Sequence, residues 1–175
     1  GYYSAGARKL GLEGDFVTAP EISPLFSRCV ANQCAEVLAM LDGGDVLEFG
    51  AGSGTMAADA LLELERLQRL PRRYYILEVS ADLRERQQKT LAERTPHLRD
   101  RVEWLDALPE SFEGVMLANE VLDAMPVERF RIRANEVNAL GVTWQLGRLD
   151  WSEVRASAPL LQAVRALEQE LGIRF

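Results

Sequence analysis

Apolar residues along the chain form either short continuous runs or stretches with helical spacing. The short runs predict buried strands at 46–49, 74–77, 102–105 and 115–118. Helical spacing predicts helices at 23–41, 55–70 and from Ser80 to beyond Leu91. This alternating order favours an α/β domain with a mainly parallel sheet, because strands covered on both faces are apolar throughout.

The two ends of the chain show other patterns. Residues 1–21 are expected to be irregular, because glycines and a proline interrupt them. The segments 129–133 and 142–149 alternate apolar and polar residues, which is typical of antiparallel strands or a hairpin. A last helix is expected at 159–171.

Composition and charge narrow the function classes. The 175 residues include 20 Lys+Arg and 27 Asp+Glu, a net charge of −7, which argues against a nucleic-acid partner. No apolar run is long enough to span a membrane. With two cysteines and no visible export signal, a reducing compartment is expected: the cytoplasm of a bacterium or the mitochondrial matrix of a eukaryote.

Histidine and cysteine limit the available chemistry. The only histidine, His97, is expected in a surface loop, so an imidazole mechanism is unsupported. Cys29 and Cys34 lie in a helical pattern without C-x-x-C spacing and are expected to be buried structural thiols. No metal site is predicted.

The glycine-rich segment after the first strand carries the strongest chemical signal. Glycines permit a tight turn and close approach of a ligand, and the helix that follows presents free backbone amides. A nucleoside triphosphate loop would need a Gly-Lys pair, which is missing. A dinucleotide loop would need a glycine where Thr55 stands.

The pattern E-x-G-x-G-x-G, beginning at Glu48, resembles motif I of class I S-adenosyl-L-methionine-dependent methyltransferases. This resemblance implies that S-adenosyl-L-methionine is the cofactor, with Glu48 near its methionine amino group. The implied binding residues of the motif are Glu48, Gly50, Ala51, Gly52, Ser53 and Gly54.

Two acids at the ends of the next strands extend the predicted cofactor site. Glu78 can accept hydrogen bonds from ribose hydroxyls, which dinucleotides also possess; the alternative is a solvated strand-end acid. Asp106 stands where this enzyme class contacts adenine, or it is a loop acid that begins a turn. Their neighbours Val79 and Ala107 are included in the predicted site.

Three further segments resemble the MidA-like family of methyltransferases over roughly residues 1–130. They match G-D-F-x-T-x-P-E-I-S-x-x-F at 14–26, E-x-S-x-x-L-R-x-x-Q at 78–87 and N-E-x-x-D-A-x-P-V at 119–127. The family includes the mitochondrial complex I assembly factor that methylates an arginine of a complex I subunit. The resemblance implies methylation of an arginine in a protein substrate.

Methyl transfer to a guanidinium indicates which residues are catalytic candidates. The bound sulfonium is already activated, so catalysis requires mainly positioning and carboxylates that orient the cation and accept its proton. Glu120 and Asp123 are the carboxylates expected to act here, and Asn119 is expected to position cofactor or substrate. The alternative for both acids is capping of a following helix.

The segment before the first helix is expected to cover the cofactor. The predicted lid or substrate residues are Asp15, Phe16, Thr18, Pro20 and Glu21. The alternative for Gly14–Asp15 is a simple turn.

We therefore expect a Rossmann-like class I methyltransferase fold in one domain, truncated at its C-terminal side because further sheet strands of the class are not visible. Its parts are an N-terminal loop and helix (1–41), a core (45–127) and an incomplete hairpin and helix (128–175). An exposed sheet edge would favour association, so a homodimer is considered. Two other functions stay open: a non-catalytic assembly scaffold and, against the evidence of Thr55, an NAD-dependent oxidoreductase.

Overall fold

The computed structural model describes residues 17–175. Its contacts divide the chain into two compact units, Gly1–Ala124 (unit 1) and Met125–Phe175 (unit 2). The expectation that 1–175 behave as one domain stays a prediction. Each unit is described by itself.

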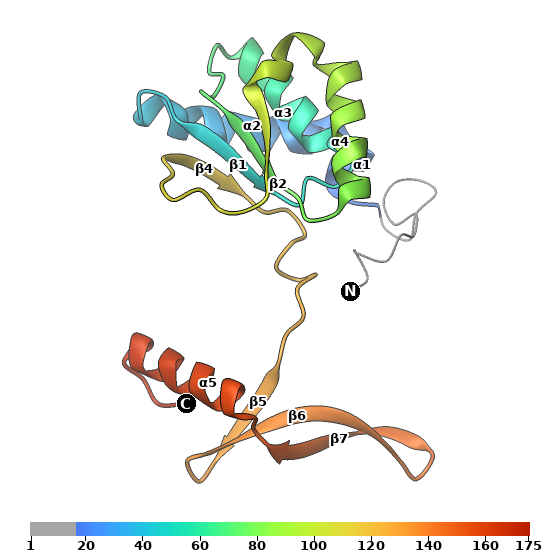
Figure 1. Cartoon of the computed structure of the whole chain (residues 1–175), viewed down its shortest axis with the longest axis vertical. Coiled ribbons are helices and arrows are strands. Elements are labelled where there is room, and N and C mark those ends of the chain that lie inside the picture. Colours follow the sequence, from blue (N-terminus) through green and yellow to red (C-terminus); the bar gives the residue numbers. More distant parts are fainter. Residues whose placement is uncertain (1–16) are drawn as a thin grey trace. The chain divides into compact units, whose positions relative to one another are not determined.

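Unit 1 is built on a four-stranded parallel sheet with the order β3-β2-β1-β4 (Figure 1). Its strands are β1 (Asp45–Phe49), β2 (Tyr74–Leu77), β3 (Val102–Leu105) and β4 (Gly114–Leu117). The four predicted strands are confirmed to within one residue, and so is the parallel α/β sheet. Because β4 lies on the opposite side of β1 from β2, the strand order reverses at β1. Open α/β sheets bind ligands at such a point, beyond the carboxyl ends of the strands.

The helices of unit 1 begin and end at residues that suit those positions. They are α1 (Ala19–Ile22), α2 (Pro24–Met40), α3 (Thr55–Arg66), α4 (Ala81–Arg94) and the 3-10 helix η2 (Pro96–Arg101). The hydroxyl of Ser23 accepts a hydrogen bond from the backbone N–H of Leu25, and that of Ser80 accepts one from Leu83. Both serines therefore cap a helix, as serine commonly does.

Two helix predictions need correction. Residues 19–21, which were expected to be irregular, belong to α1. Pro20 suits a first helical turn, and Pro24 favours the extended backbone of Ser23 that ends the helix. Helix α3 ends at Arg66 rather than at residue 70, because Gln68 adopts a left-handed backbone with a φ of 56°.

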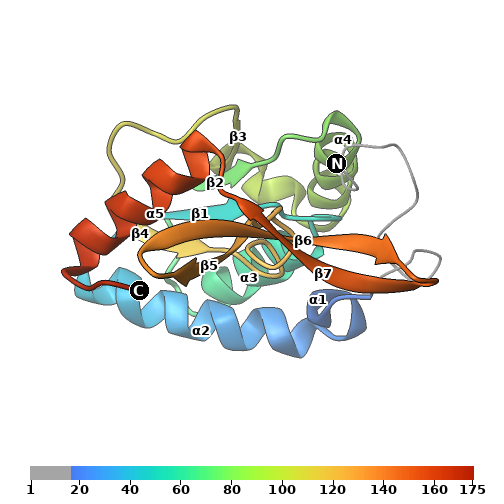
Figure 2. The same ribbon diagram turned by 90° about the horizontal axis from the view of Figure 1, so that it is seen from below.

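The core of unit 1 lies between the sheet and a layer formed by α2, α3 and α4. Within this layer α2 and α3 lie side by side (Figure 2). The strands contribute Val46, Tyr74 and Ile76, which are fully buried against these helices. On the other face, Leu47 is buried, but Met116 is 55% exposed. Motif I therefore follows a central strand that the helical layer holds firmly.

Unit 2 is an antiparallel three-stranded sheet with one helix packed on it. Its elements are β5 (Arg129–Arg133), β6 (Glu136–Gln145), β7 (Arg148–Arg155) and α5 (Ala158–Leu171). Antiparallel pairing, the strand at 129–133 and the last helix are confirmed. The segment 142–149 is not one strand, because Leu146 and Gly147 form a turn with φ values of 50° and 78°. Two successive positive φ angles suit a tight hairpin.

The cysteine prediction is correct for one residue only. Cys34 is buried, and burial raises the pKa of its thiol to about 11. Cys29 is exposed. Five residues correspond to roughly 140° around a helix, so the two thiols cannot share one face. His97 is exposed as expected, but it lies in η2, where its ring nitrogen is 3.0 Å from a carboxylate oxygen of Glu65.

Candidate cofactor site at the carboxyl ends of the strands

Three alternate residues of motif I adopt the left-handed backbone that favours glycine. The φ angles of Gly50, Gly52 and Gly54 are 58°, 55° and 84°. A Cβ built on Gly54 would lie 3.0 Å from the Cα of Gln87, so this glycine also permits α3 to approach α4. The loop therefore requires glycine for its backbone and, at Gly54, for its packing.

Ser53 connects the glycine loop to α1 and α4 through hydrogen bonds. Its hydroxyl donates a hydrogen bond to the carboxylate of Glu21 and lies 2.8 Å from the hydroxyl of Thr55. Its carbonyl accepts a hydrogen bond of 2.8 Å from Thr90 of α4. The structure thus brings Glu21, a predicted lid residue, to the cofactor loop.

The other predicted lid residues divide into two groups. Thr18 accepts a hydrogen bond of 2.9 Å at its carbonyl from the N–H of Glu21, and Pro20 is buried. Both therefore support the turn that presents Glu21. Asp15 and Phe16 lie outside the described residues.

Glu78 directly follows β2 and is only 7% exposed. One carboxylate oxygen accepts a hydrogen bond of 2.9 Å from the N–H of Ser80, and the other accepts one of 3.0 Å from the side-chain amide of Gln87. The alternative of a solvated strand-end acid is therefore wrong. Because each carboxylate oxygen can accept more than one hydrogen bond, capacity for ligand hydroxyls remains.

Glu48 lies inside the helical side of the core. It is 2% exposed, and its carboxylate accepts a hydrogen bond of 2.7 Å from the hydroxyl of Tyr74. Burial raises the pKa of Glu48 to about 7; the Tyr74 hydrogen bond opposes this shift, and the charge of Glu78 adds to it. The predicted contact with a methionine amino group is untested, whereas the bond to Tyr74 was not foreseen.

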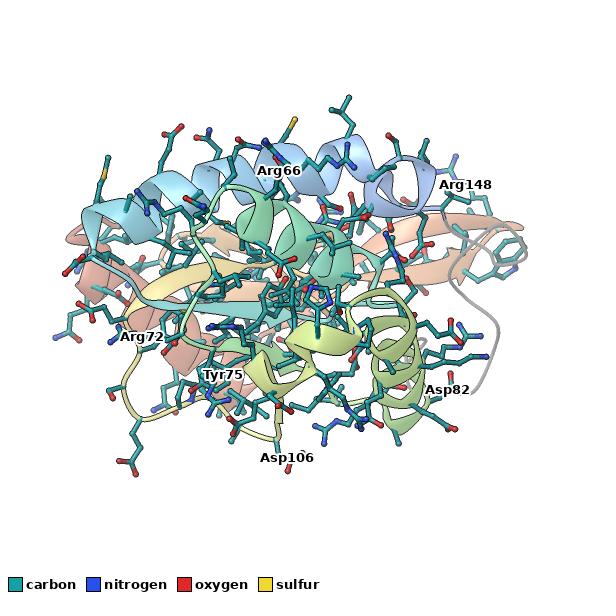
Figure 3. All side chains as sticks on the ribbon, turned by 90° about the horizontal axis from the view of Figure 1, so that it is seen from above. Arg66, Arg72, Tyr75, Asp82, Asp106 and Arg148 are labelled. Carbon is teal, nitrogen blue, oxygen red and sulfur yellow. The ribbon has the colours of Figure 1, made fainter. Side chains whose placement is uncertain are left out.

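The residues expected around adenine are exposed. The side chain of Asp106 is 89% exposed and points outward from the end of β3 (Figure 3), where Arg84 donates a hydrogen bond of 2.8 Å to it. Val79 is 91% exposed beside Glu78, and Ala107 is exposed beside Asp106. Both readings of Asp106 remain open, because exposure suits a loop acid as well as a ligand contact.

The predicted catalytic segment follows β4, the neighbour of β1. A Cβ on Gly50 would lie 3.6 Å from a methyl group of Val121, so this segment contacts the glycine loop. Asn119 is half-buried, whereas Glu120 and Asp123 are exposed. Residues 119–124 form bends and a turn instead of a helix, so the helix-capping alternative does not hold in this structure.

Glu120 itself has a strained backbone. Its φ is 54°, which costs a residue other than glycine about 1 kcal/mol or more. Backbone strain of this kind gathers at functional sites.

Gln87 and Arg84 were not among the predicted site residues; they were only positions of the family segment at 78–87. Both lie on α4, and both contact the ends of strands around Glu78. Their spacing of three residues, which places them on one helix face, was the signal that could have revealed them. Among the described residues, no group of three or more His, Cys, Asp or Glu is arranged to hold a metal ion.

A parallel α/β sheet with a glycine loop at its strand-order reversal and a buried acid after β2 fits the class I S-adenosyl-L-methionine-dependent methyltransferases. Residues 29–172 match the family model Methyltransf_28, "Putative S-adenosyl-L-methionine-dependent methyltransferase". The chain belongs to this family. The MidA-like resemblance is confirmed.

Two solved structures resemble the chain closely. A COG1565 superfamily member from Burkholderia thailandensis, bound to S-adenosyl-homocysteine, is 42% identical with a TM-score of 0.77, over 96% of this chain and 45% of that one. A native COG1565 superfamily structure from the same organism is 43% identical with a TM-score of 0.68, over 89% of this chain and 41% of that one. Both comparisons support the Rossmann-like methyltransferase fold.

Curated relatives are similar over a shorter share of their length. The mitochondrial protein arginine methyltransferase NDUFAF7 of Mus musculus is 32% identical over 75% of this chain and 36% of its own length. The homologue of Drosophila melanogaster is 30% identical over 75% of this chain and 35% of its own length. The chain thus spans little more than a third of these relatives.

Proposed function

We propose that the chain carries the cofactor site of an S-adenosyl-L-methionine-dependent protein arginine methyltransferase. The observation that carries this proposal is the left-handed glycine loop beside the buried Glu78, in a chain of this methyltransferase family. The related structure that contains S-adenosyl-homocysteine supports the choice of cofactor. The NDUFAF7 relatives, which are named as protein arginine methyltransferases, support the choice of substrate.

The described residues suit the parts of this cofactor. The glycines leave space beside the backbone of the loop for an approaching ligand, and Glu78 offers acceptors for the ribose hydroxyls. Val79 and Ala107 offer apolar surface for adenine, with Asp106 at its edge. When bound, the cofactor supplies a methyl group on a positively charged sulfur.

The carboxylates beyond β4 act on the acceptor side. Glu120 and Asp123 orient the cationic guanidinium, and Glu120 accepts the proton that the nitrogen loses as it is methylated. Asn119 positions the cofactor or the substrate through its side-chain amide. Glu21, presented by the turn that contains Thr18 and Pro20, belongs to the lid over the cofactor, and the bond between Ser53 and Glu21 supports this part of the proposal.

We also propose where the protein acts and how it associates. We place it in the mitochondrial matrix if the source is a eukaryote, as with the curated relatives, and in the cytoplasm if it is a bacterium. No helix in the described part of the chain is long and apolar enough to cross a membrane. Exposed apolar side chains on β6 and β7 support a homodimer; they are Val142, Trp144, Leu149 and Trp151.

Cofactor binding is tested by calorimetric titration of the chain with S-adenosyl-L-homocysteine and, separately, with NADH. We expect heat of binding with S-adenosyl-L-homocysteine and none with NADH. Binding of NADH alone would favour an oxidoreductase and reject the proposal.

Catalysis is tested by the transfer of a labelled methyl group to an arginine-bearing protein, with the wild-type chain and Glu120→Gln. The variant keeps the size of the side chain but cannot accept the proton, so we expect methyl transfer to fall by about a hundredfold or more while affinity for S-adenosyl-L-homocysteine is retained. Full transfer by the variant rejects the role of Glu120. If the wild type binds a partner protein but methylates none, the scaffold function is favoured.

A further inference from the structure

Gln87 is a fully buried polar side chain whose entire amide is used. It lies on α4, is 0% exposed and forms three hydrogen bonds. Its NH₂ group donates to the carbonyl of Gly52 at 3.1 Å and to a carboxylate oxygen of Glu78 at 3.0 Å. Its oxygen accepts a hydrogen bond of 3.0 Å from the indole N–H of Trp104 on β3.

The three partners determine the orientation of the amide. The indole N–H of Trp104 can only donate, so it must face the oxygen of Gln87. The carbonyl of Gly52 and the ionised carboxylate of Glu78 can only accept, so both must face the nitrogen. A rotated amide would break all three bonds inside a dry interior, which makes this orientation a strict one.

The same residue also fixes the distance between the loop and the helix. Gly54 packs on the backbone of Gln87, with 3.0 Å between a built Cβ and the Cα of Gln87. The backbone of Gln87 therefore touches one end of the glycine loop while its side chain holds the carbonyl of Gly52. Among the described residues, the other hydrogen-bond partner of the Glu78 carboxylate is Ser80, which belongs to the segment of Glu78 itself.

We propose that Gln87 is the positioning residue that holds the ribose-binding carboxylate of Glu78 and the glycine loop in one geometry. This inference rests on the proposed function. One amide connects β2, β3 and the loop, so it fixes the spacing between the acceptor of the ribose hydroxyls and the backbone beside the amino-acid end of the cofactor. Gln87 acts through Glu78 and does not itself touch the ligand.

The test compares the affinity for S-adenosyl-L-homocysteine with that for its dideoxy analogue, which lacks both ribose hydroxyls. The chain is measured as wild type, Gln87→Met, Glu78→Gln and the double variant. Gln88→Met, the same change at the exposed neighbour, is the matched control. Methionine keeps the length of the side chain and removes its hydrogen bonds.

We expect the wild type and Gln88→Met to prefer S-adenosyl-L-homocysteine by about tenfold or more, the value of a hydrogen bond to a charged acceptor. In Gln87→Met this preference falls toward parity, and adding Glu78→Gln changes it no further, because both changes act on one interaction. If Gln87→Met weakens both ligands equally and keeps the preference, Gln87 is only structural and the proposal is wrong.

The outcomes separate this inference from the proposed function. If the folded wild type binds neither ligand, the cofactor assignment fails and the inference fails with it. If the wild type and Gln87→Met both bind S-adenosyl-L-homocysteine more tightly than the dideoxy analogue by the same factor, only the inference fails.

Folding of the variants is checked through Trp104. Its indole N–H resonance, identified with Trp104→Phe, is expected to shift in Gln87→Met and to stay in place in Gln88→Met. If Gln87→Met does not fold, the change is made in the Trp104→Phe chain, because phenylalanine removes the indole N–H that methionine would leave without an acceptor. Gln87→Met in this background must lose the ribose preference that Trp104→Phe alone retains, and a retained preference overturns the proposal.

Discussion

At the scale of single residues, the site depends on a few polar or glycine positions inside an otherwise apolar framework. Glu48 occupies a strand position that faces the helical layer, where an aliphatic side chain would cost less to bury. Its carboxylate relies on one hydroxyl, that of Tyr74. Gly54 occupies a helix start where both the backbone angle and the neighbouring helix exclude a side chain. Burial of the Glu48 carboxylate therefore costs stability, whereas Gly54 is the residue that its backbone angle and packing require.

Glu48 should make stability depend on pH. Its pKa is raised to about 7 in the folded chain from an ordinary value of 4.5, so the folded state binds more protons between these values. The contribution of Glu48 to stability is therefore fully present below about pH 4.5 and is lost as the pH rises through 7, by about 3 kcal/mol. In Glu48→Gln this loss is absent, because the amide oxygen still accepts from Tyr74 without titrating.

Chemical denaturation at several pH values from 5 to 8 measures this difference. The advantage of Glu48→Gln over the wild type should grow with pH. Glu36→Gln, an exposed position on α2, is the control and should follow the wild type. An advantage of Glu48→Gln that is the same at every pH would contradict the assignment.

Gly54→Ala should cost more than its backbone angle alone predicts. Gly147 provides the matched control, since its φ of 78° is close to the 84° of Gly54 and a Cβ there meets nothing within 4 Å. Gly147→Ala should lower the free energy of unfolding by about 1–2 kcal/mol through strain. Gly54→Ala should cost a further 1–3 kcal/mol or so, because its methyl group would force α4 away. Equal costs in urea unfolding would mean that the contact with α4 is unimportant.

At the scale of elements, α4 determines how the site is held together. Arg84 and Gln87 lie on one face of this helix and contact the ends of β2 and β3. One guanidinium nitrogen of Arg84 donates to the carbonyls of Glu78 and Leu105 at 3.1 Å and 3.0 Å, and to Asp106 at 2.8 Å. Helix α4 therefore fixes both strand ends from which the predicted ribose and adenine residues extend.

Arg84→Lys tests this role of α4. A lysine carries the charge, but its nitrogen lies closer to the backbone than the terminal guanidinium nitrogen that makes all three contacts, so it cannot reach the same position. We expect about 1 kcal/mol less stability and weaker binding of S-adenosyl-L-homocysteine. The control is Arg86→Lys, whose surface pair with Asp82 at 3.7 Å is worth little. If denaturation and calorimetry give the same values for both variants, the contacts of Arg84 with the strand ends contribute neither to stability nor to ligand affinity.

The elements also show what sequence patterns can and cannot reveal. Continuous apolar runs predicted the four parallel strands correctly, although Met116, on the face away from the helices, is exposed. The serines that cap α2 and α4 were also predicted correctly, because a cap depends only on the few residues beside it. The end of α3 and the β6–β7 turn were missed, since Gln68 and Leu146 adopt left-handed backbones that their residue types do not announce. Local patterns thus predict where an element lies better than where it ends.

In the candidate site, too, local features were predicted and tertiary contacts were not. Motif I and Glu78 were identified because their spacing reflects local backbone geometry. The bonds from Gln87 to Gly52 and from Ser53 to Glu21 join residues more than 30 positions apart, so they depend on how helices pack. The burial of Glu48 against Tyr74 is likewise a tertiary effect. Spacing identified the residues proposed to contact the ligand, and only the fold reveals the residues that hold them in position.

At the scale of the whole molecule, the candidate cofactor residues all belong to unit 1, which ends at Ala124. The described part of unit 2 has its own small core around Val137, Leu160 and Val164. The site residues from Glu48 to Asp123 therefore precede the boundary between the units. This division predicts that binding of the cofactor slows hydrogen exchange in unit 1 and leaves exchange in unit 2 unchanged.

Hydrogen exchange of the full chain, with and without S-adenosyl-L-homocysteine, measures this directly. Ligand binding should slow exchange of backbone amides at 50–55, 78–80 and 119–121, because these segments surround the proposed site. Amides of β6 and β7 serve as the internal control and should exchange at unchanged rates. Protection of β6 and β7 equal to that of the glycine loop would show that unit 2 takes part in binding, and the site would then have to be extended beyond Ala124. Protection confined to unit 1 would leave unit 2 available for the protein substrate or a second copy of the chain.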